Sequence, residues 1–262
     1  MKLEIRKASF GYGENILYTN LSFSLNSGEL LCVLGPNGIG KTTLFKTILM
    51  LLKLKSGEIL IDGKNINTFP YKKLYKCIAY VPQAHTPPFP FTVMDVVLMG
   101  RAAYIKDFSC PSKMDKKIAE NSLNLLDITH LKNKIYTELS GGERQLVLIA
   151  RAIAQEASII IMDEPTSNLD YGNQIKVLTL IKSLCTNSNQ TIIMSCHNPN
   201  HALLYGTKVA IMKRGGLFSF GEPCHEITTE VIKDIYGVNI KIVETNINES
   251  LTKNVCIPFD FK

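Results

Sequence analysis

The sequence contains no tryptophan, no CxxC pair and no apolar run long enough to cross a membrane. Its longest apolar runs, IIIM at 159–162 and ILMLLKL from Ile48, fall far short of the ~20 residues that a spanning helix needs. Residues 1–6 alternate charged and apolar side chains, so we expect no signal peptide. These absences predict a cytoplasmic protein whose membrane role, if it has one, depends on a partner.

Neither cysteine nor charge indicates a specialised class of protein. The seven cysteines are odd in number and lack the Cys/His spacing of zinc sites, which favours buried thiols in a reducing compartment. The net charge of +6 is thinly spread, and we expect the lysine pairs at 72–73 and 116–117 to be solvated rather than to bind nucleic acid. With 45% hydrophobic and 20% charged residues, the chain is expected to form an ordinary globular core.

The hydrophobic pattern predicts an α/β core with an inserted, mainly helical subdomain at about 84–158. Strands are expected within residues 1–34, ending in the buried run 30–34, and a helix from Lys41 to about Leu52. Within the insertion we expect three helices. The first runs from Thr92 to about Arg101, and the second follows a segment that carries apolar residues from Ile118 to Ile128. The third runs from Arg144 to about Gln155. The core resumes with strands at 159–162, 191–195 and 208–212 and a helix around 172–185.

We expect the main domain to span residues 1–222 and a short extension to span 223–262. The extension should contain a helix from Thr228 to Tyr236 and a short strand from Asn239 to Val243. Residues from about Ile247 show no regular pattern, so we expect them to be loosely structured.

Residues 35–42 match the phosphate-loop pattern G-x-x-x-x-G-K-[ST] between a predicted strand and a predicted helix. Glycines let such a loop curl so that backbone N–H groups face the phosphates, and the helix N-terminus adds partial positive charge. Lys41 is expected to contact the β- and γ-phosphates, and the Thr42 hydroxyl to bind Mg²⁺. The predicted nucleotide-binding residues are Gly35, Pro36, Asn37, Gly38, Ile39, Gly40, Lys41, Thr42 and Thr43.

Two carboxylates follow the apolar strand predicted at 159–162. Asp163 is placed to hold Mg²⁺, as the acidic residue at this strand end does in phosphate-loop NTPases. Glu164 is placed to orient and polarise an attacking water. A strand that ends in Asp-Glu is often only a surface turn, but the phosphate loop upstream favours a catalytic role. The two motifs together predict binding and hydrolysis of Mg²⁺-ATP.

Residues 139–145, Leu-Ser-Gly-Gly-Glu-Arg-Gln, resemble the LSGGQ signature of the ATP-binding cassette (ABC) ATPases, with Glu143 where Gln is usual. Ser140, Gly141 and Gly142 open a predicted helix, so they present a hydroxyl, N–H groups and a dipole end to an anion. A serine cap with two glycines would be an ordinary helix start if it stood alone. Because the segment 139–145 precedes Asp163 and Glu164, we identify the chain as similar to this family over residues 1–222.

Other landmarks of the family follow in the expected order. Tyr12 resembles the aromatic residue that stacks on adenine, although a plain strand-end tyrosine would give the same pattern. Gln83 resembles the Q-loop glutamine that reaches Mg²⁺ and the attacking water. His197 resembles the switch histidine that contacts the γ-phosphate, and residues 167–170 resemble the D-loop. The resemblance therefore implies catalytic roles for Glu164, His197 and Gln83, and Mg²⁺ ligation by Thr42, Gln83 and Asp163.

The resemblance implies an α/β fold of the P-loop NTPase (ABC ATPase) type, with a mixed or parallel sheet, the inserted helical subdomain and an antiparallel β subdomain. It also implies that the signature of one copy, Ser140, Gly141, Gly142 and Glu143, completes the ATP site of another. Since the chain holds one set of motifs, a homodimer is expected. ATP between two helix N-termini would draw the copies together, and hydrolysis would let them part.

An ATPase of this kind without a membrane span resembles transporter subunits that dock on a separate integral-membrane permease at the cytoplasmic face of the membrane. Segment 85–101, with the apolar and aromatic residues 87–93 beside Gln83, resembles the region that receives a coupling helix of the permease. A buried connector is the alternative for this segment. The resemblance implies a periplasmic or surface substrate-binding protein as an indirect partner, and no nucleic acid.

Segments 91–101, 197–202 and 235–238 resemble the importer branch for iron–siderophore, haem, cobalamin and molybdate-type cargo. Iron complexes are favoured, with molybdate or tungstate next. An export ATPase, an ATP-sensing regulator and a non-transport ABC ATPase are the alternatives. DNA-repair members carry a long coiled coil between phosphate loop and signature, which this chain lacks, and translation members fuse two cassettes. A regulator would be favoured by loss of Glu164 or His197, and both are present.

Overall fold

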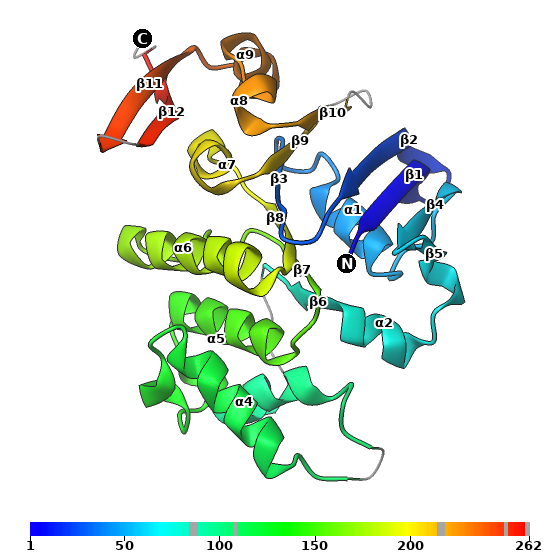
Figure 1. Ribbon diagram of the computed structural model, residues 1–262, viewed down its shortest axis with the longest axis vertical. Helices are drawn as coiled ribbons and strands as arrows, with labels where there is room; N and C mark the ends of the chain where they lie inside the picture. Colours follow the sequence, from blue (N-terminus) through cyan, green and yellow to red (C-terminus); the bar gives the residue numbers. More distant parts are fainter. Residues whose placement is uncertain (84–88, 107–108, 214–217, 249–250, 260–262) are drawn as a thin grey trace. The chain divides into compact units, whose positions relative to one another are not determined.

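The computed structural model describes residues 1–83, 89–106, 109–213, 218–248 and 251–259. The chain forms two compact units: unit 1 comprises Met1–Thr68 and Ile193–Lys262, and unit 2 comprises Phe69–Ile192 (Figure 1). Unit 1 contains the predicted phosphate loop and the C-terminal extension, and unit 2 contains the helical stretch with the signature. The boundaries expected at 84–158 and at 222/223 stay predictions.

Unit 1 begins with an antiparallel sheet of strand order β2-β1-β4-β5. β1 (Leu3–Tyr12) pairs with both β2 (Asn15–Leu25) and β4 (Ser56–Ile61), and β4 turns back into β5 (Lys64–Asn65). Alternating side chains such as Leu21, Phe23 and Leu25 are buried, as the period of two in a half-covered strand requires. A 3₁₀ turn at Ile66–Thr68 follows the sheet. The predicted N-terminal strands and antiparallel β part are confirmed.

The strand that leads into the phosphate loop lies in a second sheet of unit 1. β3 (Leu30–Leu34) is buried along its whole length and runs parallel to β9 (Lys208–Met212), which pairs antiparallel with β10 (Phe218–Gly221). A wholly apolar strand is typical of a sheet covered on both faces. α1 (Lys41–Ile48) follows β3, and α7 (Pro199–Tyr205) follows β8 (Thr191–Ser195). Parallel and antiparallel pairs together confirm the mixed sheet that was expected.

The C-terminal part of unit 1 is more regular than its sequence predicts. α8 (Pro223–Glu226) and α9 (Thr229–Tyr236) precede an antiparallel hairpin of β11 (Ile240–Asn248) and β12 (Leu251–Pro258). The expectation of a loosely structured end from about Ile247 is therefore wrong for residues 251–258, while residues 249–250 and 260–262 lie outside the described residues. The side-chain amide of Asn200, on α7, donates to the Cys256 carbonyl (3.1 Å) and accepts from the Cys256 N–H (2.7 Å). This anchor is distant in sequence, so no local pattern indicates it.

Unit 2 combines a parallel strand pair with five helices among its described residues. β6 (Ile78–Val81) runs parallel to β7 (Ile159–Met162). The helices are α2 (Tyr71–Cys77), α3 (Val93–Leu98), α4 (Lys113–Asn124), α5 (Gly141–Ala154) and α6 (Tyr171–Ser188), with 3₁₀ turns at Met99–Arg101, Thr129–Leu131 and Tyr136–Glu138. This arrangement confirms that helices dominate the stretch before β7.

Several predicted helices are present but shorter. α1 ends at Ile48 instead of near Leu52, because Met50 takes a left-handed φ of 58° and the N–H groups of Leu51 and Leu52 both donate to the Lys46 carbonyl. α4 ends at Asn124, so the apolar residues that follow it lie in a turn. Short elements such as α2, α7 and β6 escaped prediction, since seven or fewer residues carry too little periodicity to distinguish helix from strand.

A buried arginine fixes the end of the α3 region against the C-terminal end of α5. The Arg101 side chain is 6% exposed and donates to Asp115 Oδ1 (3.1 Å), Glu156 Oε2 (2.7 Å) and the Ala154 carbonyl (2.8 Å). At Gly100 a Cβ would lie 2.2 Å from the Arg151 carbonyl oxygen, so only glycine permits this approach. The described part of the segment 85–101 is thus tied to the helix that begins at the signature.

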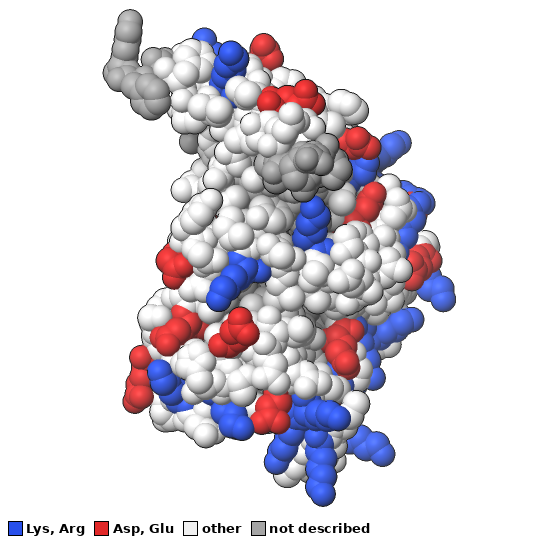
Figure 2. Space-filling view, turned by 60° about the vertical axis from the view of Figure 1, so that its left-hand side comes forward, with Lys and Arg blue, Asp and Glu red and all other residues white. Residues whose placement is uncertain are grey.

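No helix among the described residues is long and apolar enough to cross a membrane. Over the face drawn in Figure 2, basic and acidic side chains are interspersed, and Lys and Arg gather toward the lower end, where Figure 1 draws α4. α4 carries Lys113, Lys116 and Lys117 on a short stretch of exposed or half-exposed surface. On this face the basic residues form no continuous stripe of the kind that tracks a nucleic-acid backbone.

Candidate nucleotide-binding site

The phosphate loop joins β3 to α1 within unit 1, as the sequence predicts. Gly35, Gly38 and Gly40 have φ values of 152°, 73° and 112°. At Gly35 a Cβ would lie 2.6 Å from the Met212 carbonyl oxygen, so glycine is required where the chain leaves the sheet. Ile39 is buried, which anchors the loop. Asn37, Gly38 and Thr42 are exposed, so the outer side of the loop is open to a ligand.

The side chain of Lys41 is held by backbone carbonyl groups of the phosphate loop. This side chain is buried, and Nζ donates to the carbonyl oxygens of Gly35 (2.7 Å) and Pro36 (3.0 Å). A buried ammonium group needs oxygen partners, since leaving it unpaired would be costly. Phosphate oxygens offer the same kind of partner with more negative charge. The first turn of α1 contains no acidic residue, so its N-terminus also favours an anion.

Tyr236 contributes a contact that sequence reasoning missed. The N–H of Gly35 donates to the hydroxyl oxygen of Tyr236 (3.2 Å), so the C-terminal end of α9 is linked to the first residue of the phosphate loop. Burial raises the pKa of Tyr236 to about 12, and the phenol therefore stays protonated and neutral at neutral pH. The two residues are 201 positions apart, so no local signal could have paired them.

We expect the substitution Tyr236→Phe to weaken ATP binding about fivefold, since one ordinary hydrogen bond contributes roughly 1 kcal/mol. The phenyl ring keeps the packing, whereas the buried Gly35 N–H loses its acceptor and the loop entrance loosens. Titration with a fluorescent ATP analogue measures the change. Tyr75→Phe, at an exposed tyrosine of α2, serves as the control. Unchanged affinity with Tyr236→Phe would show that the contact does not shape the loop.

In unit 2, Asp163 and Glu164 follow β7 as predicted. The N–H of Asp163 donates to the Val81 carbonyl (2.8 Å), which extends the pairing of β7 with β6, and the Asp163 side chain is buried. Glu164 has a left-handed φ of 49°, a conformation that non-glycine residues adopt rarely and often at functional sites. Its carbonyl accepts from the Ser167 hydroxyl (3.0 Å) and N–H (3.2 Å), which hold this turn.

The Glu164 carboxylate is paired with the predicted Q-loop residue. Gln83 Nε2 donates to Glu164 Oε2 over 2.7 Å, although the two residues are 81 positions apart. Gln83 follows β6 and Glu164 follows β7, so the parallel strand pair brings their carboxyl ends together. In open α/β sheets this is the edge where ligands bind. The structure thus joins two of the three predicted catalytic residues in one hydrogen bond.

The signature residues form the N-terminus of α5, as expected. Ser140 is the N-cap: its hydroxyl accepts from the Glu143 N–H (3.2 Å), and the Glu143 carboxylate accepts from the Ser140 N–H (2.8 Å). Hydrogen bonds from Ser140 lower the pKa of Glu143. Glu and Gln serve this capping box equally, so Glu143 fits where the family usually has Gln. The S-x-x-E spacing could have predicted the box from sequence.

The predicted D-loop lies against the signature within unit 2. A Cβ added at Gly142 would lie 3.1 Å from the Asn168 carbonyl oxygen, which is tighter than ordinary contact. Gly141 and Gly142 supply the first N–H groups of α5, and neither has a hydrogen-bond partner among the described residues. These donors face no carbonyl of their own helix. They are the part of the signature that an anion can use.

His197 and Tyr12 occupy the ends of strands in unit 1. The N–H of Cys196 donates to the Val33 carbonyl (3.1 Å), so exposed His197 follows β8 beside β3, the strand that leads into the phosphate loop. Tyr12 ends β1 and is 51% exposed, which leaves its ring accessible. Unit 1 therefore holds the phosphate loop, Tyr12 and His197, and unit 2 holds Gln83, Asp163, Glu164 and the signature. Positions 84–88 of the predicted partner-binding segment lie outside the described residues.

The sequence profile of the ABC transporter family matches residues 18–167. The chain is 42% identical over 255 residues to an uncharacterised ABC transporter ATP-binding protein of Haemophilus influenzae, covering 97% of both chains. It is 38% identical to the molybdate import ATP-binding protein MolC of the same organism, covering 89% of this chain and 87% of MolC. It is 36% identical to a probable iron chelatin transport ATP-binding protein of Helicobacter pylori, with 93% and 96% of the two chains covered.

Two solved structures of ABC proteins also match this chain. A transporter assigned to the metal-chelate type, in an inward-facing conformation, matches with a TM-score of 0.85 and 34% identity, covering 98% of this chain and 97% of that one. A dimeric ATP-binding cassette in a post-hydrolysis state, bound to ADP and phosphate, matches with a TM-score of 0.72 and 27% identity, covering 84% of this chain and 98% of that one.

Proposed function

This chain belongs to the ABC transporter family, and we propose that it is the ATP-hydrolysing subunit that powers import of a metal chelate through a separate permease. Its fold is that of the ABC ATPases, with a P-loop and mixed sheets, and it is the ATP-binding subunit of such a transporter. The observation that carries the catalytic proposal is the Gln83–Glu164 hydrogen bond beside Asp163, in a chain that also holds the phosphate loop and the signature.

ATP binding is assigned to the phosphate loop, and adenine stacking to Tyr12. In this proposal Lys41 exchanges its loop carbonyl partners for phosphate oxygens, and backbone N–H groups of residues 37–43 surround the phosphates. A hydroxyl, an amide oxygen and a carboxylate, from Thr42, Gln83 and Asp163, are hard oxygen donors of the kind that Mg²⁺ prefers. When bound, Mg²⁺ neutralises charge on the phosphates.

Hydrolysis is assigned to Glu164, Gln83 and His197. Glu164 orients a water and accepts its proton, and the amide of Gln83 fixes the direction of the carboxylate. His197 contacts the γ-phosphate and senses whether it is present. Each step uses a residue at the carboxyl end of a strand.

A second copy of the chain completes the site in this proposal. ABC ATPase domains work as dimers, and a related cassette has been solved as one. The N–H groups of Gly141 and Gly142 and the Ser140 hydroxyl offer an anion site on α5, which the γ-phosphate bound to the other copy would fill. The Ser140 hydroxyl oxygen accepts from the Glu143 N–H, and its hydrogen would turn from the Glu143 carboxylate to the phosphate. Hydrolysis would remove the shared charge and release the pair.

The permease-docking surface is assigned to the segment after Gln83. Phe89 is 62% exposed and makes an edge-on contact with Phe91, at a ring distance of 6.0 Å. Met99 and Tyr104 are further exposed apolar residues along the same stretch. Arg101 and Gly100 tie this stretch to the C-terminal part of α5, so movement of the docking surface would be passed along that helix to the signature at its N-terminus. Exposed aromatic residues on a rigid support are typical of protein interfaces.

Import of an iron chelate is the preferred assignment, because named relatives include ATP-binding proteins for iron chelatin, petrobactin and siderophore transport. The similarity to MolC supports molybdate as the second candidate. The permease and the binding protein would select the cargo, since this subunit does not contact it in the proposal. The location that follows is the cytoplasmic face of the membrane, held there by the permease.

Reconstitution with the cognate permease tests this function. We expect slow ATP hydrolysis by the chain alone and severalfold faster hydrolysis with the permease in lipid vesicles, accompanied by uptake of an iron chelate. Phe89→Ala should abolish the stimulation and keep the basal rate, whereas Tyr71→Ala, at another exposed aromatic residue, should change neither. Uptake of molybdate instead would select the second candidate. Stimulation by DNA or ribosomes, and none by the permease, would overturn the transporter assignment.

A further inference from the structure

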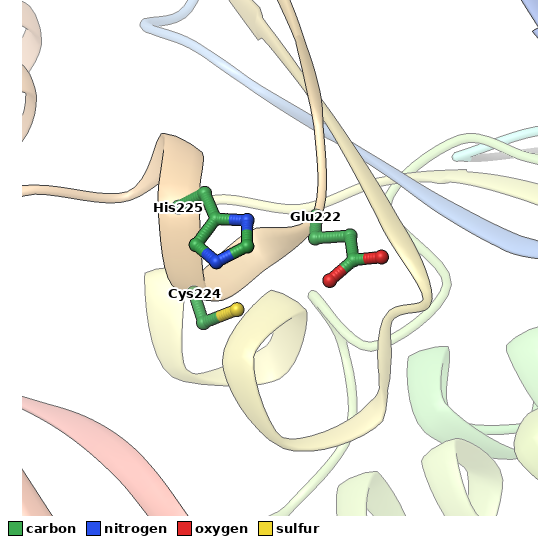
Figure 3. Close-up of side chains that lie close together, drawn as sticks. All are labelled: Glu222, Cys224 and His225. Carbon is green, nitrogen blue, oxygen red and sulfur yellow. The ribbon is translucent and has the colours of Figure 1, made fainter.

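Three chemically different side chains meet in the turn that leads from β10 into the C-terminal extension. Ligand atoms of Glu222, Cys224 and His225 lie within 4.8 Å of one another, and all three residues are exposed. Figure 3 shows the carboxylate, thiol and imidazole of this turn directed toward a common space. Because all three come from the same unit, their geometry depends only on this local turn.

The backbone explains why these side chains converge. The Glu222 carbonyl accepts from the N–H groups of His225 (3.0 Å) and Glu226 (3.0 Å), which closes a tight helical turn. Pro223, at the first position of α8, restricts its own φ and stiffens the turn. Side chains three residues apart on such a turn lie on the same face. The arrangement is therefore preformed rather than dependent on a ligand.

The three ligand atoms are chemically available. Among the described residues, no hydrogen bond or ion pair involves the side chains of Glu222, Cys224 or His225. The neighbouring acid, Glu226, is by contrast engaged with the Ser219 hydroxyl. A cavity of about 300 Å³, lined in part by Glu222, Cys224 and Glu244, adjoins the turn. A ligand bound there would replace water rather than break an existing contact.

We propose that Glu222, Cys224 and His225 bind one late first-row transition-metal ion of the Zn²⁺ class. Thiolate, imidazole and carboxylate are the three protein ligands of zinc, and Mg²⁺ or Ca²⁺ would require oxygen donors throughout. In a zinc tetrahedron the ligand atoms lie about 3.3–3.5 Å apart, so these exposed side chains need to close by roughly 1 Å. Three protein ligands leave the fourth position to water.

The position of this site gives it a consequence for the rest of unit 1. It lies between β10 and α9, and α9 ends at Tyr236, which contacts the phosphate loop through Gly35. A metal ion that crosslinks residues 222–225 would restrict the start of the extension. The site does not overlap the residues assigned to ATP hydrolysis. A test of metal binding is therefore independent of the proposed transport function, and either proposal can be wrong without the other.

Titration of the metal-free full-length chain with Co²⁺, without nucleotide, tests the proposal. We expect one ion per chain, a thiolate-to-cobalt charge-transfer band and displacement of Co²⁺ by Zn²⁺ but not by excess Mg²⁺. Cys224→Ser should abolish the band. His225→Ala and Glu222→Gln should each raise the dissociation constant by about tenfold or more, since even outer-shell changes at metal sites cost 10–100-fold.

Cys110→Ser is the matched control, because Cys110 is also an exposed free cysteine but lies in unit 2. This variant should keep the band and the stoichiometry. If the charge-transfer band survives in Cys224→Ser, or disappears equally in Cys110→Ser, the proposed site is wrong. Co²⁺ binding without any thiolate band would likewise overturn it. Since all three substituted residues are exposed, thermal melting of each variant should match that of the wild-type chain.

Discussion

Glu164→Gln is expected to lower the rate of ATP hydrolysis by about 10²–10⁴-fold, the range that a positioned general base contributes. The amide has the shape of the carboxylate but cannot take a proton from water. It can still accept the hydrogen bond from Gln83 Nε2, which is 2.7 Å from the carboxylate in the wild-type chain. ATP binding should therefore persist, and single-turnover hydrolysis together with equilibrium nucleotide binding measures both quantities.

Glu138→Gln is the control for this substitution, because Glu138 is an exposed glutamate in the same unit. It should hydrolyse ATP at the wild-type rate. Hydrolysis by Glu164→Gln at a wild-type rate would remove Glu164 from the mechanism. Because Glu164 also adopts a left-handed backbone conformation, the circular dichroism spectrum and melting temperature of the variant should be compared with those of the wild type.

The second large expected effect is a loss of ATPase activity that tests whether two copies of the chain share each ATP site. Lys41→Ala removes the phosphate contact, and Gly142→Asp places a carboxylate at the signature, close to the Asn168 carbonyl, where it would repel phosphate. Each variant alone is expected to lose at least about 99% of its ATPase activity, as removal of one transition-state contact can cost 10²–10³-fold.

Mixing the two inactive variants should restore activity. In a mixed dimer one site combines the intact phosphate loop of the Gly142→Asp chain with the intact signature of the Lys41→Ala chain. Random pairing of equal amounts makes about a quarter of all sites intact, so recovery up to about a quarter of the wild-type rate is expected if sites act independently. No recovery, in a mixture shown by crosslinking to contain mixed dimers, would contradict a shared site.

The local motifs were predictable because their chemistry requires particular residue types at fixed, short spacings. The curled glycines of the phosphate loop, the acidic residues after β7 and the serine before α5 all lie where the sequence placed them. The Ser140–Glu143 capping box was also readable from spacing alone. Helix ends were less predictable, since a single left-handed residue such as Met50 decides where α1 stops.

Contacts between residues far apart in the sequence could not be predicted from local motifs. The anchoring of β12 depends on the side chain of Asn200, which is 56 positions from Cys256. The β-branched residues of this hairpin favour strands, but Asn and Lys interrupt them, and an isolated two-stranded hairpin is only marginally stable. The sequence pattern therefore gave the helix α9 and part of β11 but not β12.

The sequence by itself determined that this chain has the residues to bind and hydrolyse ATP, and which residue types occupy each motif. Only the tertiary structure decided that Gln83 is hydrogen-bonded to Glu164, that Tyr236 contacts the start of the phosphate loop, and that the turn at 222–225 gathers three side chains able to bind a metal ion. The physical reason is the range of the interactions. A motif is set by bonds along the chain, whereas a contact across 81 or 201 positions exists only after strands and helices have packed.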